Sequence, residues 1–161
     1  MALRSAGQRG AAAAGFILLL PVLVWATALV LDVARLVVVR AQLQSAADLG
    51  SLAAAQELDL ERLYQGQPWL REGEAEQVAR QWVMQNLQHV LPRESSQARI
   101  EVTVINAEEG IPQRHPWTGR WIRNPTVAVR VVVPTRMLWV PGRPTVPIQV
   151  QADASVLTLP P

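Results

Sequence analysis

The longest uncharged stretch of the chain lies near its N-terminus and covers residues 11–31. These 21 residues are apolar or small almost throughout, and as an α-helix they would span about 30 Å, the thickness of a bilayer's hydrocarbon core. Pro21 lies inside the stretch, where it costs one backbone hydrogen bond, but membrane helices tolerate proline. The pattern predicts a single transmembrane helix over residues 11–31.

Charged residues flank this stretch on both sides. Arg4 and Arg9 precede it without any acid, whereas Asp32, Arg35 and Arg40 follow it. Because arginine is retained on the cytoplasmic side of membrane helices, the flanks favour a cytoplasmic segment 1–10 and a C-terminal domain outside the membrane. Asp32 and Arg35 are predicted to mark the membrane exit, with an intramembrane charge pair between them as the alternative.

A cleaved secretory signal is the main alternative interpretation of the same stretch. Arg4 and Arg9 would form its basic start, and Ala26-Thr27-Ala28 would be the Ala-x-Ala cleavage site. Against cleavage, the apolar run continues through Leu31 and passes into helix-favouring sequence without a turn residue. We therefore favour an anchor that is kept.

Beyond the membrane, apolar and small residues recur every three or four positions, as on one face of a helix. The positions are Leu36, Val39, Leu43, Ala46, Gly50 and Ala53. This spacing predicts that the helix continues to about Leu58, so that the anchor and its extension form one rod of more than 40 residues.

The outer half of this rod carries two neighbouring stripes of small residues, each repeating every four positions. One stripe is Ala46, Gly50 and Ala54, and the other is Ala47, Ser51 and Ala55. Small residues at this spacing allow another backbone to come close. Two partners stay open at this stage: the protein's own sheet, or helices of other subunits in a homo- or hetero-oligomer.

The rest of the chain predicts a small domain. Gly and Pro at 65–68 mark a break, and an apolar stripe predicts a second helix over 72–91, closed by Pro92. The period then falls to two over 100–104, 127–133 and 146–156, which predicts half-buried antiparallel strands. We expect an α+β, pilin-like fold: a long N-terminal helix, then a second helix on a three- or four-stranded antiparallel sheet.

The two longest connections, 106–125 and 135–145, are rich in Pro, Gly and Trp and are the predicted places of external contact. The second contains an apolar tip at Met137, Leu138 and Trp139. Since tryptophan favours the lipid interface, this tip is predicted to contact the membrane surface or a partner; capping of the sheet is the alternative.

Charge and chemistry narrow the function further. The chain has 15 basic and 13 acidic residues, which is too even a balance for nucleic-acid binding. It has no cysteine, and its two histidines, His89 and His115, lack neighbours that would complete a metal site. The Glu108-Glu109 pair is predicted to be solvated, and neither a phosphate-binding loop nor a nucleophile motif is found. We expect no enzyme activity, cofactor or metal.

Particular residues carry a family resemblance. They are Arg9-Gly10, the apolar run with Pro21, Leu31-Asp32-Val33-Ala34-Arg35, and the segment LQSAADLGSLAAA at 43–55. This N-terminal part resembles the TadE/TadG-like proteins of Flp (tight adherence, Tad) pilus assembly. The resemblance implies an anchor in the cytoplasmic (inner) membrane, and partners among the bilayer and other pilus or secretion-assembly subunits.

Prepilin peptidase substrates of such systems are cut after a glycine and usually carry Glu at the fifth mature position. A cut after Gly10 would place Gly15 there, and a cut after Gly15 would place Leu20. The chain therefore resembles the TadG-like type, which keeps its anchor, more than a cleaved TadE-like pseudopilin.

The sequence thus predicts four segments. Residues 1–10 are the cytoplasmic N-terminus, 11–31 the membrane helix, 32–65 its extracytoplasmic continuation and 66–161 the helix-plus-sheet domain. The predicted function is a non-catalytic, membrane-anchored component of a Tad/Flp-type pilus or a related secretion and adhesion assembly. The alternative is a secreted binding domain released near Ala28.

Overall fold

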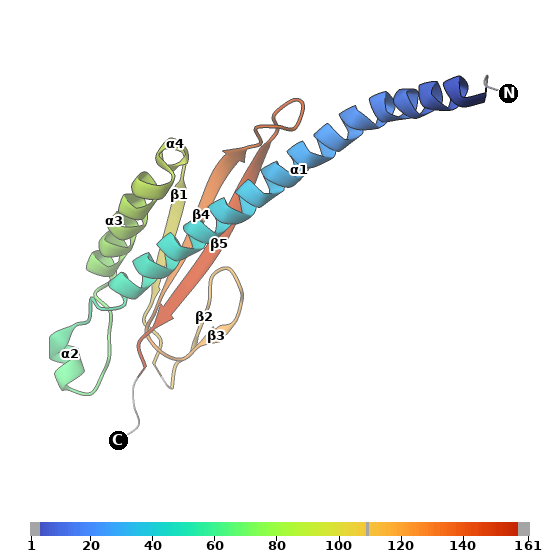
Figure 1. Cartoon of the computed structure of the whole chain (residues 1–161). Helices are drawn as coiled ribbons and strands as arrows, with labels where there is room; N and C mark the ends of the chain where they lie inside the picture. Colours follow the sequence, from blue (N-terminus) through green and yellow to red (C-terminus); the bar gives the residue numbers. More distant parts are fainter. Residues whose placement is uncertain (1–3, 109, 158–161) are drawn as a thin grey trace.

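The computed structural model of the chain describes residues 4–108 and 110–157, and it has the predicted α+β architecture (Figure 1). A long helix is followed by a small domain in which helices pack on an antiparallel sheet. In chain order the elements are α1 (Arg4–Ala54), α2 (Leu60–Tyr64), α3 (Glu72–Val90), α4 (Pro92–Ser95), β1 (Arg99–Ile105), β2 (Gln113–Arg114), β3 (Trp121–Ile122), β4 (Thr126–Arg136) and β5 (Thr145–Ser155).

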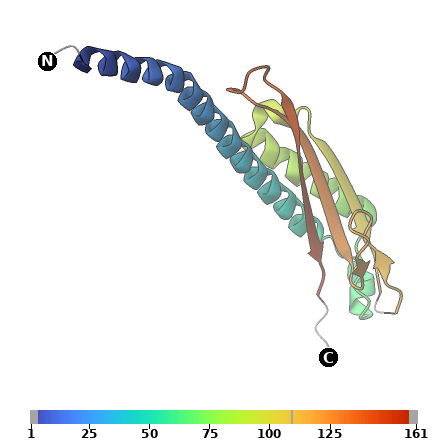
Figure 2. The ribbon, with the colours of Figure 1, turned by 90° about the vertical axis from the view of Figure 1, so that its right-hand side faces the viewer.

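The N-terminal half of α1 projects away from the domain (Figures 1 and 2). Its large apolar side chains, from Phe16 to Leu31, are exposed. Both views show this half bending away from the line of the rest of the helix, and Pro21 lies inside it, where the lost hydrogen bond permits a kink. By length and composition α1 is suited to cross a membrane, as the sequence predicted.

The C-terminal half of α1 ends at Ala54, four residues before the predicted end at Leu58. Leu58 forms an antiparallel bridge with Leu70, and this extended pairing takes the chain out of the helix. The short helix α2 follows, and the Asp59 carboxylate caps its N-terminus by accepting from the backbone N–H groups of Glu61 and Arg62. The predicted helical continuation over 32–65 is therefore two helices separated by a turn.

The main sheet has three antiparallel strands in the order β1-β4-β5. α1 and α3 lie against one face, α1 over β5 and β4 and α3 mainly over β1. Alternate residues of the strands face these helices, as period two requires. The buried core includes Val39, Leu43, Ala46 and Ala47 of α1, Ala75, Ala79, Val83 and Leu87 of α3, Val127, Val129, Val131 and Val133 of β4, and Ile148, Val150 and Ala152 of β5.

Side chains from the two helices also reach the edges of this sheet. Arg80 of α3 donates to the carbonyl oxygen of Ile100 in edge strand β1, at 2.7 Å. Gln44 of α1 donates to the carbonyl oxygen of Gln151 in the other edge strand, β5, at 2.8 Å. Each edge strand is thus bonded to the helix that covers it.

The connection 106–125, predicted only as a place of external contact, contains a second, two-stranded sheet. β2 and β3 pair antiparallel, with Gln113 opposite Ile122. A small apolar cluster under this hairpin joins Ile105, Ala107, Ile122 and Ala128, with Trp117 packed against it. Strands of two residues are too short to show a period in the sequence, which is why the hairpin was missed.

Candidate functional site

The most distinctive polar site lies where α1 leaves the predicted membrane segment. The carboxylate of Asp32 accepts three backbone hydrogen bonds from the β4–β5 connection, from the N–H groups of Leu138, Trp139 and Val140, each at 2.9 Å. The side chain is buried, with 1% of the residue exposed. A buried carboxylate is costly unless its oxygens are bonded, and three N–H donors meet that need. We call this contact the Asp32 clamp.

A tight turn gives the loop the shape that the Asp32 clamp needs. The loop closes through hydrogen bonds from Met137 N–H to the Pro144 carbonyl oxygen and from Arg143 N–H to the Val140 carbonyl oxygen, both at 3.0 Å. Pro141 and Gly142 occupy the centre of the turn, and Gly142 has a φ of 81°, as a type II turn requires at that position. The successive N–H groups before the turn can then converge on one carboxylate.

Arg35, one turn further along α1, bonds to two other parts of the domain. Its guanidinium donates to the carbonyl oxygen of Arg136 at 2.7 Å and to Glu94 Oε1 at 3.0 Å. Within the described residues no salt bridge joins Arg35 to Asp32. Asp32 directly follows the uncharged stretch and Arg35 lies three residues further along, as predicted. Each of them also bonds α1 to the domain. The sequence offered one sign of this role, an isolated acid directly after 21 uncharged residues.

The apolar tip at 137–139 is held by its backbone and leaves side chains outside the core. Trp139 is 62% exposed and Leu138 is 48% exposed, whereas Met137 is half-buried. Neither exposed residue belongs to the apolar clusters of the domain. Capping of the sheet therefore does not account for Leu138 and Trp139, and contact with the membrane surface or a partner stays a prediction.

The two small-residue stripes of α1 face the protein's own interior. Ala46, Ala47, Gly50, Ser51 and Ala54 are buried, and Ala55 is half-buried against the same core. A Cβ atom on Gly50 would lie 2.5 Å from Val83 Cγ2 and 3.1 Å from the Ala79 carbonyl oxygen. The close backbone is therefore α3, and the sheet lies beside it. Because these side chains are already in contact within the chain, they do not present a surface to other subunits.

The opposite side of the same half of α1 carries exposed apolar side chains, with the exposed polar residues Ser45 and Asp48 among them. Val37 is 63% exposed, Val38 55%, Leu49 44% and Leu52 57%. We call these four residues the outer face of α1. The apolar character of the helix thus continues past the predicted membrane segment on the side that the domain leaves uncovered. The spacing of the small residues marks only the inner side of the helix, so the sequence pattern did not predict this face.

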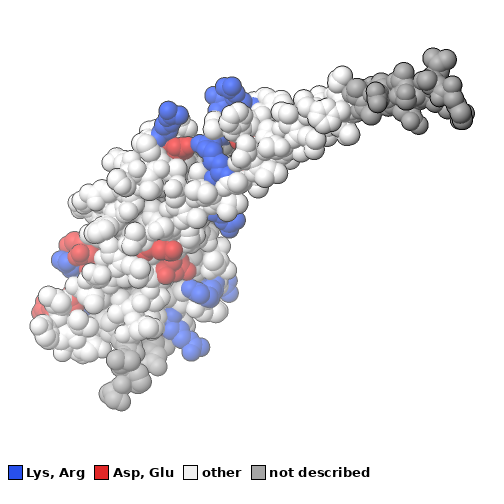
Figure 3. Space-filling model, in the orientation of Figure 1, with Lys and Arg blue, Asp and Glu red and all other residues white. Residues whose placement is uncertain are grey.

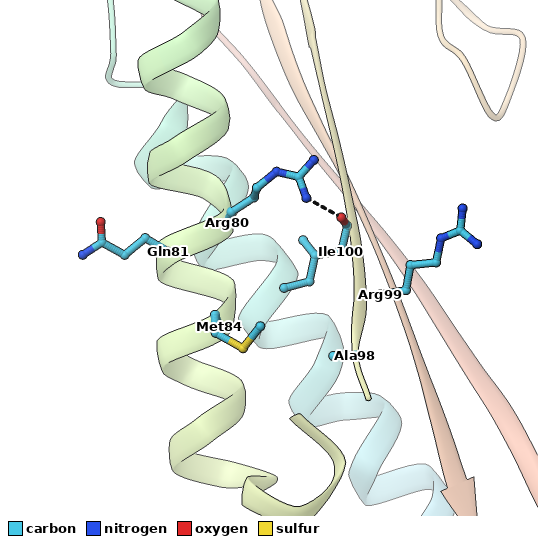
Figure 4. Close-up of a pocket in the computed structure, with 6 residues that line it drawn as sticks. All are labelled: Arg80, Gln81, Met84, Ala98, Arg99 and Ile100. Atoms are coloured by element: carbon cyan, nitrogen blue, oxygen red, sulfur yellow. Dashed lines mark hydrogen bonds between the residues drawn. The ribbon is translucent and has the colours of Figure 1, made fainter. Parts of the chain in front are cut away.

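A shallow groove of about 540 Å³ lies between α3 and β1 (Figure 4). In Figure 4 Arg80 points across it to the Ile100 carbonyl oxygen, Met84 and Ile100 line its apolar part, and Arg99 points away from it. Arg80 also forms an ion pair with Glu76, at 2.7 Å. Its lining has no carboxylate, histidine or hydroxyl group, so it offers no general base or nucleophile.

His115 stabilises the fold through its hydrogen bonds. It is buried, its Nδ1 accepts from the N–H groups of Trp117 and Thr118, and its Nε2 lies 2.9 Å from Asp153 Oδ1. Because Nδ1 is an acceptor, Nε2 carries the proton and donates to Asp153. Arg120 also bonds Asp153, at 3.2 Å. This network holds the β2–β3 hairpin on β5.

The other histidine and the Glu108-Glu109 pair, which the sequence singled out, give no sign of a reactive site in residues 4–108 and 110–157. His89 is exposed near the end of α3, Glu108 is exposed, and Glu109 lies outside the described residues. In the part of the chain that the structure describes, no three His, Cys, Asp or Glu residues come together as metal ligands. Gly10 lies within α1, and the prediction that the chain is not cleaved there stays a prediction.

Comparisons with known proteins bear on the N-terminal part of the chain. No curated protein and no solved structure was found to match the chain. A family model matches the chain from Gly10, through the predicted membrane segment and Asp32, to just beyond the end of α1. Residues 10–57 match the Tad family model, described as TadE/G-like Flp pilus assembly.

Proposed function

We propose that this protein is a non-catalytic, membrane-anchored component of a Tad/Flp-type pilus or of a related secretion and adhesion assembly. The family match over residues 10–57 and the membrane-length helix α1 support a component of this class. The outer face of α1 adds the observation that carries the proposal. It gives the chain an apolar surface for helix packing beyond the membrane, on the side that its own domain does not use.

In this proposal α1 serves two purposes along its length. Residues 11–31 lie in the cytoplasmic membrane, with segment 1–10 in the cytoplasm and the domain outside. The chain keeps this anchor, as in the TadG-like type. Beyond Asp32, the inner side of α1 forms part of the domain core, while the outer face packs on a neighbouring subunit. Burial of Val37, Val38, Leu49 and Leu52 against that subunit would contribute about 25 cal/mol for each Å² of apolar surface removed from water.

Site-specific crosslinking in intact membranes tests the proposed contact. The chain has no cysteine, so Leu49→Cys carries one unique attachment point for a thiol-linked photo-crosslinker. We expect irradiation to join the labelled chain to another assembly subunit or to a second copy of itself. Leu60→Cys is the matched control, because Leu60 is a 63% exposed leucine on α2, away from α1. Equal crosslinking at positions 49 and 60 would contradict a specific surface on α1.

The intact mass of the membrane-bound protein tests the anchor. We expect the mass of the uncut chain, which keeps both segment 1–10 and residues 11–31. A soluble product that begins after Ala28 would overturn the proposal in favour of the alternative, a secreted binding domain released by signal peptidase. A membrane-bound product that begins after Gly10 would instead indicate processing of the TadE-like type.

A further inference from the structure

Four arginines meet at the end of the domain from which α1 leaves. Arg35 comes from α1, Arg93 from α4, Arg136 from the end of β4 and Arg143 from the β4–β5 loop. They line a pocket of about 580 Å³, together with Glu94, Gln97, Pro134, Leu138 and Thr145. Figure 3 shows basic side chains gathered at this end of the domain, with a small acidic area between them.

The positive charge of the four arginines exceeds the negative charge of the pocket lining. Glu94 is the one acidic residue in its lining, and it pairs with Arg35 at 3.0 Å. In the described chain, no carboxylate forms a salt bridge with Arg93, Arg136 or Arg143. Their guanidinium groups are therefore free to bind an anion, and planar guanidinium groups bind phosphate oxygens with paired hydrogen bonds.

The Asp32 clamp places this pocket level with the predicted membrane surface. The uncharged stretch ends at Leu31, and the next residue holds the backbone of Leu138, Trp139 and Val140. Arg35 is only three residues further, about 4.5 Å along the helix axis. The exposed side chains of Leu138 and Trp139 lie in the same loop, and tryptophan favours the headgroup region of a bilayer.

We propose that this pocket binds the phosphate headgroup of an anionic phospholipid of the membrane that α1 spans. Arg93, Arg136 and Arg143 hold the phosphate, while Leu138 and Pro134 supply an apolar wall beside the glycerol and the first acyl carbons. A volume of about 580 Å³ is typical of pockets for small ligands, which span roughly 300–1,000 Å³. This inference rests on membrane anchoring alone and is independent of the pilus assignment.

A lipid-binding measurement on the full chain in neutral detergent tests this proposal. Phosphatidylglycerol or phosphatidylcholine is added, and native mass spectrometry counts the lipids retained on the protein. We expect clear preference for phosphatidylglycerol. A cationic side chain at a membrane surface contributes about 1 kcal/mol, which is roughly a fivefold change in affinity. The triple variant Arg93→Gln, Arg136→Gln and Arg143→Gln should therefore lose retention by tenfold or more.

The matched control removes three arginines elsewhere on the domain, as Arg99→Gln, Arg114→Gln and Arg123→Gln. All three are exposed and none lines the pocket. The control has the same net charge as the pocket variant and should retain phosphatidylglycerol as the unmodified chain does. A double variant, Arg93→Gln with Arg136→Gln, leaves the β4–β5 turn unchanged and should show an intermediate loss.

Three outcomes would overturn the proposal. The first is equal retention of the two lipids, and the second is equal loss in the pocket and control variants. The third is that the triple variant loses binding of inorganic phosphate but retains phosphatidylglycerol as the unmodified chain does, which would mean that the pocket takes a free anion. A protein that stays in membranes but gives any of these results would leave the proposed function standing.

Discussion

The two halves of α1 are both helical and rich in apolar residues, but they differ in what surrounds them. The N-terminal half projects away from the domain, and its large side chains, such as Phe16 and Trp25, are exposed. On the C-terminal half, the inner side is made of residues as small as Ala47 and Gly50, and it is fully packed. Large exposed side chains suit a lipid environment, whereas small ones let α3 come close. Small side chains on the side that faces the domain therefore distinguish the packed half from the exposed half.

Adding a bulky side chain at Gly50 should destabilise the packed half of α1 more than any other change described below. Leu at this position would overlap Val83 and the Ala79 carbonyl oxygen of α3, so Gly50→Leu should lower the free energy of unfolding by about 3 kcal/mol. Chemical unfolding of the full chain in detergent measures the change. Gly73→Leu on α3 is the control, because nothing lies within 4 Å of a Cβ atom there. An undisturbed Gly50→Leu protein would mean that α1 and α3 are further apart than described.

Removal of the Asp32 clamp should have the next largest effect. Asp32→Ala leaves three backbone N–H groups without their acceptor, and the expected loss of stability is roughly 2 kcal/mol. Hydrogen exchange should speed up at residues 138–140 before it changes in β1. Asp48→Ala is the matched control on the same helix, because Asp48 is exposed and accepts only from the Gln44 side chain among its side-chain contacts. Similar losses in both variants would count against a specific role for the clamp.

A change in the exposed half should leave the domain almost unaffected. Pro21→Leu restores a backbone N–H inside α1 and should straighten the bend, yet the unfolding free energy of the domain should change by less than about 0.5 kcal/mol. Spin labels on either side of residue 21 would report the straightening as a longer distance between them. Destabilisation of the domain by Pro21→Leu would show that the two halves are coupled.

Much of this fold follows from local sequence patterns. The parts that the sequence did not predict are either very short or depend on residues far apart in the chain. Residues 11–31 were predicted from an uncharged apolar run of membrane length. α3 and the strands β1, β4 and β5 were predicted because each repeats a period over many residues. α2, α4 and the β2–β3 hairpin are too short to show a period. The Asp32 clamp joins residues 106 to 108 positions apart, so nothing near Asp32 in the sequence identifies the loop that it holds. The sequence likewise did not identify the partner of Gly50, because a stripe of small residues predicts a close contact but not which element makes it.

The hydrogen bonds from Arg80 and Gln44 to the two edge strands have a consequence for how copies of this protein can associate. An open strand edge is a template for strand addition and for aggregation, and a blocked carbonyl interrupts the ladder that an incoming strand would need. With both edges obstructed by side chains of their own helices, the sheet is poorly suited to polymerise through its strands. Amyloid-like stacking of neighbouring copies through these edges is therefore disfavoured.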